Sequence, residues 1–278
     1  MAVKKILVPA DLPGNNEATL TYASELAASA GAGVYLFHAA PLPEFYVSEL
    51  DDYAKFEKEF KAVIKRIHSA ALTKLQEIGK QYFGASQKVI CRAVLAKNVY
   101  NEILDYAETV KPDLIIMGGG EGSSRIRIGA NTERILRLTK IPVLVVRNKA
   151  RVKARKIVFA SDFRKNSVEV FGRIAGFIED GRTQVRLLYI NTKSEFEEYD
   201  AVKERIEKFK KNFQYDFSVV IRAGKSVESS IVKYAESIDA DLIAMGIKRK
   251  KRLPLYFTDR ITEGVINISG IPVLAVNS

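Results

Sequence analysis

A glycine-rich loop near the middle of the chain has the composition of a phosphate-binding turn. The apolar run at 114–117 stops at the sequence GGGEG, at 118–122, and GANT at 129–132 then begins a segment with helical spacing. Glycine lets the backbone approach an anion closely, and free N–H groups at a helix start face that anion with the positive end of the helix dipole. This order of strand, glycine loop and helix start predicts a phosphate cradle.

An acidic residue closes the first β-rich run of the chain, where KILVPAD ends in Asp11. If the first and fourth strands are neighbours, Asp11 lies close to the loop that begins at Gly118. Contact with a ligand is the favoured role of Asp11, and a local role in a turn or a helix cap is the alternative. His38 ends the second strand, and there a satisfied, partly buried histidine is favoured over a ligand contact.

Segments of the first half recur in the same order in the second half. Residues 5–11, 113–118 and 141–146 have counterparts 151, 128 and 130 positions later. Three matches in the same order indicate an internal duplication. The drop in displacement from 151 to 128 gives the first half 23 additional residues, which we place in the long segment after its second strand.

Strands alternate with helical segments in both halves. The first half has expected strands at 5–11, 34–38, 89–94, 113–117 and 143–146, and the second at 157–160, 185–190, 217–221, 242–245 and 273–276. Such alternation gives a parallel sheet with right-handed crossovers, and nearly continuous apolar strands fit a sheet covered on both faces. We therefore predict two doubly wound α/β domains, at 1–148 and 149–278, whose ligands bind beyond the carboxyl ends of the strands.

Composition sets the class of protein and of partner. Hydrophobic residues make up 47% and charged residues 28% of the 278 positions, as in soluble globular proteins. No apolar run approaches the ~18 residues of a membrane span, and the chain begins without an apolar leader, so we expect a cytoplasmic protein. The net charge of +11 favours anionic partners, although it is equally typical of a lysine-rich surface that only confers solubility.

Taken together, these segments resemble the universal stress protein family, in two copies that cover essentially the whole chain. The resemblance rests on ILVPAD at 6–11, the strand at 34–38, PDLIIMG at 112–118, GANTERIL at 129–136 and IPVLVV at 141–146. It implies a five-stranded, adenine nucleotide alpha hydrolase-like fold with strand order 3-2-1-4-5. It also implies pairing through the last strands, here between the two halves of one chain or in a homodimer, and an unidentified protein partner.

The resemblance further implies that AMP or ATP, with Mg²⁺ as an optional companion, binds in the first half. The implied nucleotide-binding residues are Pro9, Ala10, Asp11, Ala39, Met117, Gly118, Gly119, Gly120, Gly122, Gly129, Ala130, Asn131 and Thr132.

This sequence departs from the family motif, G-x2-G-x9-G-(S/T), in three ways. Only six residues separate Gly122 from Gly129, so the loop is shorter than that of the family. Ala130 replaces the usual hydroxyl residue, for which Asn131 and Thr132 are partial substitutes. Glu121 places a carboxylate in the loop, which disfavours terminal phosphates unless Mg²⁺ bridges them. These departures favour a monophosphate over ATP.

The second half has lost more of the motif, because Asp259 takes the place of Gly129. We therefore expect the first domain to sense a stress-related adenine nucleotide and the second to serve assembly. One alternative is an interaction scaffold that binds no nucleotide. Another is a surface for nucleic acid or acidic lipid, built on the basic run at 248–252, although this is the less favoured partner class.

The search for catalytic chemistry finds little. The GKS sequence at 224–226 lacks the upstream glycine of a P-loop, since Val219 stands there, and the two histidines are not spaced as metal ligands. Arg125 and Arg127 have the chemistry of a phosphate clamp, with a solvated loop as the equal alternative. No residue is a competent general base for fast hydrolysis, so we expect a binding protein, with slow nucleotide hydrolysis at most.

Overall fold

The computed structural model describes residues 3–12, 17–42, 53–119, 128–148, 150–178, 182–247 and 260–277, with the side chains of 53–57 excepted. The first half contains β1 (Lys5–Pro9), α1 (Glu17–Ala30), β2 (Gly33–Pro41), α2 (Tyr53–Tyr82), β3 (Val89–Ala96), α3 (Val99–Val110), β4 (Leu114–Gly118), α4 (Ala130–Leu138) and β5 (Val143–Val146). The second contains β6 (Lys156–Ala160), α5 (Ser167–Ile174), the 3-10 turn η1 (Ala175–Phe177), β7 (Gln184–Thr192), α6 (Tyr199–Lys210), β8 (Phe217–Gly224), α7 (Val227–Ser237), β9 (Leu242–Ile247), α8 (Arg260–Ile268) and β10 (Val273–Asn277).

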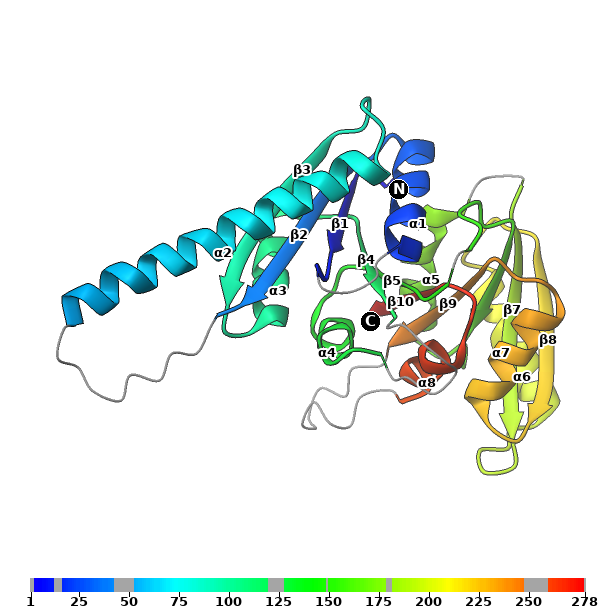
Figure 1. Ribbon diagram of the computed structural model, residues 1–278. Helices are drawn as coiled ribbons and strands as arrows, with labels where there is room; N and C mark the ends of the chain where they lie inside the picture. Colours follow the sequence, from blue (N-terminus) through cyan, green and yellow to red (C-terminus); the bar gives the residue numbers. More distant parts are fainter. Residues whose placement is uncertain are drawn as a thin grey trace.

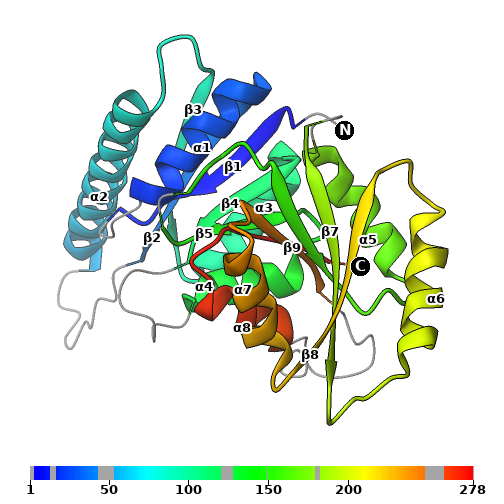
Figure 2. The ribbon, with the colours of Figure 1, turned by 90° about the vertical axis from the view of Figure 1, so that its right-hand side faces the viewer.

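The described strands form one ten-stranded sheet in the order β3-β2-β1-β4-β5-β10-β9-β6-β7-β8. Neighbouring strands within each half are parallel, whereas β5 and β10 pair antiparallel, with Leu144 opposite Leu274. Each half therefore has the order 3-2-1-4-5, which confirms the predicted fold class. Figures 1 and 2 show the strands of one half continuing into those of the other.

Alternate residues of the strands supply two separate apolar layers. In β4, Leu114 and Ile116 pack on one face with α1, α2, α5 and α6, while Ile115 and Met117 pack on the other with α3, α4, α7 and α8. This double coverage explains why the strands read as continuous apolar runs. The carboxyl ends of β1 and β4 lie side by side, because these two central strands pair directly and in parallel.

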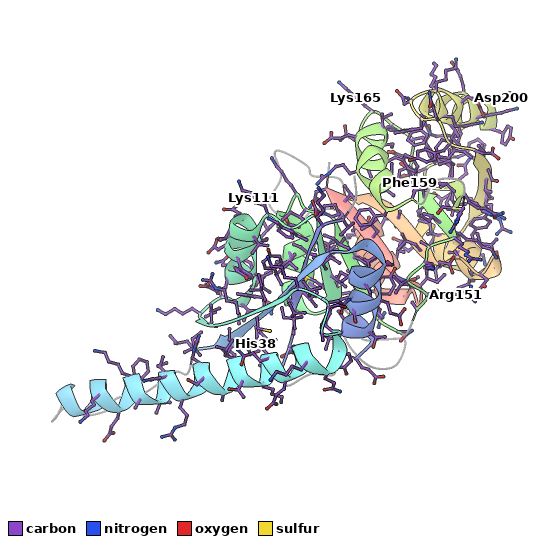
Figure 3. The ribbon with its side chains drawn as sticks, turned by 90° about the horizontal axis from the view of Figure 1, so that it is seen from above. His38, Lys111, Arg151, Phe159, Lys165 and Asp200 are labelled. Atoms are coloured by element: carbon purple, nitrogen blue, oxygen red, sulfur yellow. The ribbon has the colours of Figure 1, made fainter. Side chains whose placement is uncertain are left out.

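The two halves differ mainly between their second and third strands. Pro41 and Val89 are 48 positions apart, whereas the equivalent Thr192 and Phe217 are 25 apart, so the 23 additional residues lie where the change of displacement predicts. Much of the addition is helix, because α2 has 30 residues and α6 has 12. Seen from above, the beginning of α2 extends beyond the rest of the first half (Figure 3). No described helix is long and apolar enough to span a membrane.

Candidate functional site

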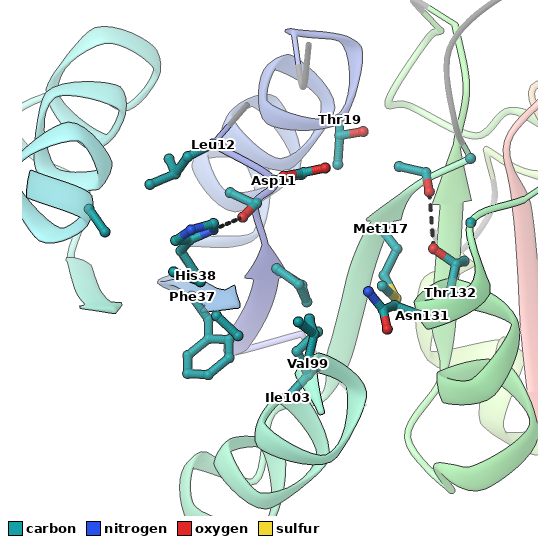
Figure 4. Close-up of a pocket in the computed structure, with 18 of the residues that line it drawn as sticks. Asp11, Leu12, Thr19, Phe37, His38, Val99, Ile103, Met117, Asn131 and Thr132 are labelled. Atoms are coloured by element: carbon teal, nitrogen blue, oxygen red, sulfur yellow. Dashed lines mark hydrogen bonds between the residues drawn. The ribbon is translucent and has the colours of Figure 1, made fainter. Parts of the chain in front are cut away.

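A cavity of about 1090 Å³ opens at the carboxyl ends of β1, β2 and β4 (Figure 4). It brings together every described member of the predicted site: Pro9, Ala10, Asp11, Ala39, Met117, Gly118, Gly119, Gly129, Ala130, Asn131 and Thr132. Gly120 and Gly122 lie outside the described residues, as do Glu121, Arg125, Arg127 and the basic run at 248–252. We call this cavity the first pocket.

The end of β1 is held firmly against β2. The Ala10 N–H donates to the Phe37 carbonyl at 2.8 Å, and the buried ring of His38 donates from Nδ1 to the Ala10 carbonyl at 2.8 Å (Figure 4). A carbonyl oxygen can only accept, so Nδ1 carries the proton. His38 is thus the satisfied histidine that the sequence favoured, although its ring also lines the pocket. Its role is to fix the backbone that presents Asp11.

The start of α4 forms the opposite wall. The first intrahelical bond runs from the Glu133 N–H to the Gly129 carbonyl at 3.1 Å, so the helix ladder does not use the N–H groups of Ala130, Asn131 and Thr132. Gly129 caps this helix with φ −59° and ψ 146°, a conformation open to any residue, and no atom of the described part of the chain lies within 4 Å of the position its Cβ would take. Neither backbone strain nor protein packing requires glycine here, which leaves room for a ligand.

The other two described loop glycines are explained by the protein itself. A Cβ on Gly118 would lie 3.3 Å from the Thr19 hydroxyl of α1, and a Cβ on Gly119 would overlap the side-chain stem of Arg147. The Thr132 hydroxyl donates to the Gly118 carbonyl at 3.3 Å, which ties α4 to the end of β4. This bond commits the hydroxyl hydrogen of Thr132 to the scaffold, and Asn131 is the polar side chain left at the helix start.

Several lining residues escaped the sequence reasoning. The apolar side of the first pocket includes Phe37, Val99 and Ile103, and its cations are Lys74 and Arg147. The i, i+4 spacing of Val99 and Ile103 identifies one face of α3, but only the fold reveals that this face turns towards the pocket. Lys74 comes from the enlarged helix α2, which has no sequence motif that signals a ligand.

The second half has a smaller cavity, of about 730 Å³, at the equivalent sheet edge. Asp162, the counterpart of Asp11, accepts the Arg164 N–H at 3.1 Å, which is a turn contact of the kind given above as the alternative role of Asp11. A Cβ on Gly246, the counterpart of Gly118, would lie 3.1 Å from Val170. The position of His38 is taken by Tyr189, 151 residues later, which also lines this cavity.

Tyr189 belongs to a charged network that gives this second cavity a different character. Its hydroxyl donates to Glu197 at 2.8 Å, and Arg205 donates to both oxygens of the same carboxylate at 2.7 and 3.1 Å. The hydrogen bonds from Arg205 hold the pKa of Glu197 at about 2, while burial, followed by the bond to Glu197, raises the pKa of Tyr189 to about 12. Both groups keep fixed charge states near neutrality. No group of metal-ligating side chains occurs among the residues for which coordinates are described.

The fold and the first pocket define an α/β protein with a ligand-sized cavity at the carboxyl ends of its central strands. The chain belongs to the universal stress protein family, because the model of that family matches it twice, at residues 2–147 and 153–277.

Known proteins resemble parts or all of the chain. A universal stress protein of Methanocaldococcus jannaschii is 28% identical over 146 residues, which are 52% of this chain and 82% of the relative. The crystal structure of a universal stress protein from Archaeoglobus fulgidus DSM 4304 superimposes on 98% of each chain, with a TM-score of 0.67 and 18% identity, and so shows the fold alone.

A ligand complex is known for another member of the family. The universal stress protein from A. fulgidus in complex with dAMP matches 52% of this chain and 98% of its own, with 20% identity and a TM-score of 0.33. That TM-score is too low to infer dAMP binding by this chain, so the complex describes the A. fulgidus protein alone.

Proposed function

We propose that residues 1–148 bind an adenine nucleotide, AMP or ATP, in the first pocket, and that residues 149–278 form a degenerate domain that serves assembly. In this proposal the chain is a cytoplasmic regulator of the stress response. The phosphate contacts the segment from Gly118 to Gly129 and orders a surface there. An unidentified protein partner binds this surface.

The observation that carries the proposal is the open space beside Gly129. A glycine that neither conformation nor packing against the described residues requires, at a helix start whose first N–H groups lie outside the helix ladder, suits the approach of a phosphate. The rest of the first pocket suits the remainder of a nucleotide. The half-buried side chains of Ile67 and Val99 offer apolar surface to a base, and the carboxylate of Asp11 is an acceptor for ribose hydroxyls. The volume of about 1090 Å³ is just above the ~300–1,000 Å³ usual for small-molecule sites.

The test is to identify any co-purifying nucleotide by mass spectrometry and then titrate the stripped protein calorimetrically with AMP, ADP and ATP, with and without Mg²⁺. We expect one equivalent per chain. Gly129→Val should weaken nucleotide binding by more than about tenfold, because the valine side chain enters the space where we expect phosphate to bind. The substitution should reduce the stability of the protein by less than about 1 kcal/mol, since glycine is not required at this helix cap.

Asp162→Ala is the matched control, since Asp162 is the counterpart of Asp11 in the second half. It should leave the affinity unchanged, whereas Asp11→Ala should lower it. The proposal fails if no nucleotide co-purifies and no heat is released, or if Gly129→Val binds like the wild type.

A nucleotide-independent scaffold is the second candidate, and two observations favour it. Backbone pairing of β5 with β10 joins the halves in one sheet, and packing against Arg147 accounts for Gly119. This candidate predicts that partner binding is the same in stripped and nucleotide-saturated protein. A pull-down of one partner under the two conditions separates the hypotheses.

A further inference from the structure

The last turn of α8, in the second half, reaches the wall of the first pocket. The side-chain oxygen of Asn267 accepts the N–H of the buried residue Ile128 at 2.7 Å, across 139 positions of sequence. Ile128 immediately precedes Gly129, the cap of α4. A residue of the degenerate half therefore fixes the backbone at the place where we expect phosphate to bind.

The same turn also holds a cation that lines the pocket. Arg147 follows β5, its stem crosses Gly119, and its Nη1 donates to the carbonyls of Ile266 and Asn267. Carbonyls in the last turn of a helix lack intrahelical partners and carry the negative end of the helix dipole. The positive charge of Arg147 offsets the negative end of the α8 dipole. The end of α8 can therefore lie near an anion site without repelling an anionic ligand.

The halves are related by duplication, but the second half cannot repeat the Asn267 contact, because an arginine stands in the equivalent position and a guanidinium has no acceptor. The counterpart of Asn267, 130 positions earlier, is Arg137, which instead forms an ion pair with Glu263 at 2.6 Å. The counterpart of Arg147 is Asn277, which donates to the carbonyls of Leu136 and Thr139 at the far end of α4. Leu136 is the counterpart of Ile266, so the contact that Arg147 makes with the end of α8 has an equivalent at the end of α4. The acceptor that Asn267 supplies is therefore the feature that distinguishes the end of α8 from the end of α4, and it holds the residue beside Gly129.

We propose that the end of α8 is a positioning element of the first site, with Asn267 setting the start of α4 and the α8 carbonyls setting Arg147. This inference rests on the proposed nucleotide function and deepens it. The second half is then a structural component of the first site, and nucleotide affinity depends on both halves.

The experiment compares the intact wild-type chain with Asn267→Ala and Asn277→Ala by calorimetric titration with AMP and with ATP plus Mg²⁺. Hydrogen–deuterium exchange at Ile128 and thermal melting accompany each titration. Asn267→Ala should weaken nucleotide binding about three- to tenfold, the equivalent of one lost hydrogen bond, and should speed exchange at Ile128. Asn277→Ala removes a buried asparagine from the same interface, but neither it nor its partners line the first pocket, so it should lower the melting temperature without changing affinity.

The outcomes separate this inference from the proposed function. If the wild type binds no nucleotide, the proposed function fails and this inference fails with it. If the wild type binds and Asn267→Ala binds equally well, only the positioning role is overturned. Equal losses of affinity in both variants would also overturn it, because they would reflect general loosening between the halves.

Discussion

At the residue scale, two side chains with a common ancestry have acquired different duties. His38 and Tyr189 occupy equivalent positions 151 residues apart, but His38 donates to its own scaffold at Ala10 whereas Tyr189 donates to Glu197. The first arrangement ties the end of β2 to the end of β1, and the second places the carboxylate of Glu197, held by Arg205, at the second cavity. The duplicated fold therefore tolerates divergence at the exact positions that line its pockets.

The charge network around Glu197 predicts a specific dependence of stability on pH. Because the hydrogen bonds from Arg205 lower the folded-state pKa of Glu197 from 4.5 to about 2, its contribution is complete above about pH 5 and is lost as the pH falls towards 2. Glu197→Gln should cost about 1–2 kcal/mol at pH 7, after allowance for solvent screening, and much less near pH 2–3. Urea denaturation at pH 7, 5 and 3 measures this difference.

Glu204 supplies the control for that experiment. It pairs with Lys208 on α6, but both side chains are largely exposed, so Glu204→Gln should leave the urea midpoint unchanged at each pH. A difference between Glu197→Gln and wild type that stayed constant from pH 7 to pH 3 would contradict the assignment.

At the element scale, the helix after the fourth strand of each half is fastened by one hydroxyl. Thr132 donates to the Gly118 carbonyl at 3.3 Å, and its counterpart Thr262 donates to the Gly246 carbonyl at 3.2 Å. Both threonines are buried, and both bonds join a helix start to a strand end. This contact survived in the second half while the glycine cap did not, which indicates a structural duty shared by both halves.

Removing either hydroxyl should therefore destabilise the protein by a similar amount. Thr132→Val and Thr262→Val keep the side-chain shape and should each cost about 1 kcal/mol, because a part-buried hydrogen bond is lost. Chemical denaturation of the two variants measures the cost. Thr109→Val is the comparison, since the exposed Thr109 bonds only to Asp105 within its own helix and should matter little. Wild-type stability in Thr132→Val would refute the fastening role.

At the scale of the whole molecule, the two halves share one sheet and should unfold together. The β5–β10 ladder places the buried Leu144 and Leu274 in register, and the Arg137–Glu263 ion pair joins α4 to α8. We expect one calorimetric transition in the intact chain. Leu274→Ala should cost about 2–5 kcal/mol and shift the unfolding of both halves, although the substitution lies in the second.

Hydrogen–deuterium exchange followed along the sequence distinguishes cooperative from independent unfolding. Peptides from β1 and β4 should lose protection in Leu274→Ala together with those from β9 and β10. Two separate transitions, with protection lost in the second half alone, would show that the halves fold independently.

The sequence by itself determined the duplication, the order of strands and helices, the site of the 23-residue enlargement, and a candidate site at which Asp11 and the glycines of the 118–129 segment meet at one sheet edge. These features depend on local patterns, namely apolar periodicity, glycine placement and an acid at a strand end, and parallel strands carry such residues to one sheet edge. The family resemblance supplied the strand order, which the fold confirmed.

Only the tertiary structure decided which glycine leaves room for a ligand and which is required by packing. The sequence does not distinguish Gly119 from Gly129, yet Gly119 packs against the side chain of Arg147 and Gly129 faces open space. The contact between Asn267 and Ile128 likewise joins residues 139 positions apart. No local pattern encodes such a contact, because it arises from how two folded halves meet across β5 and β10.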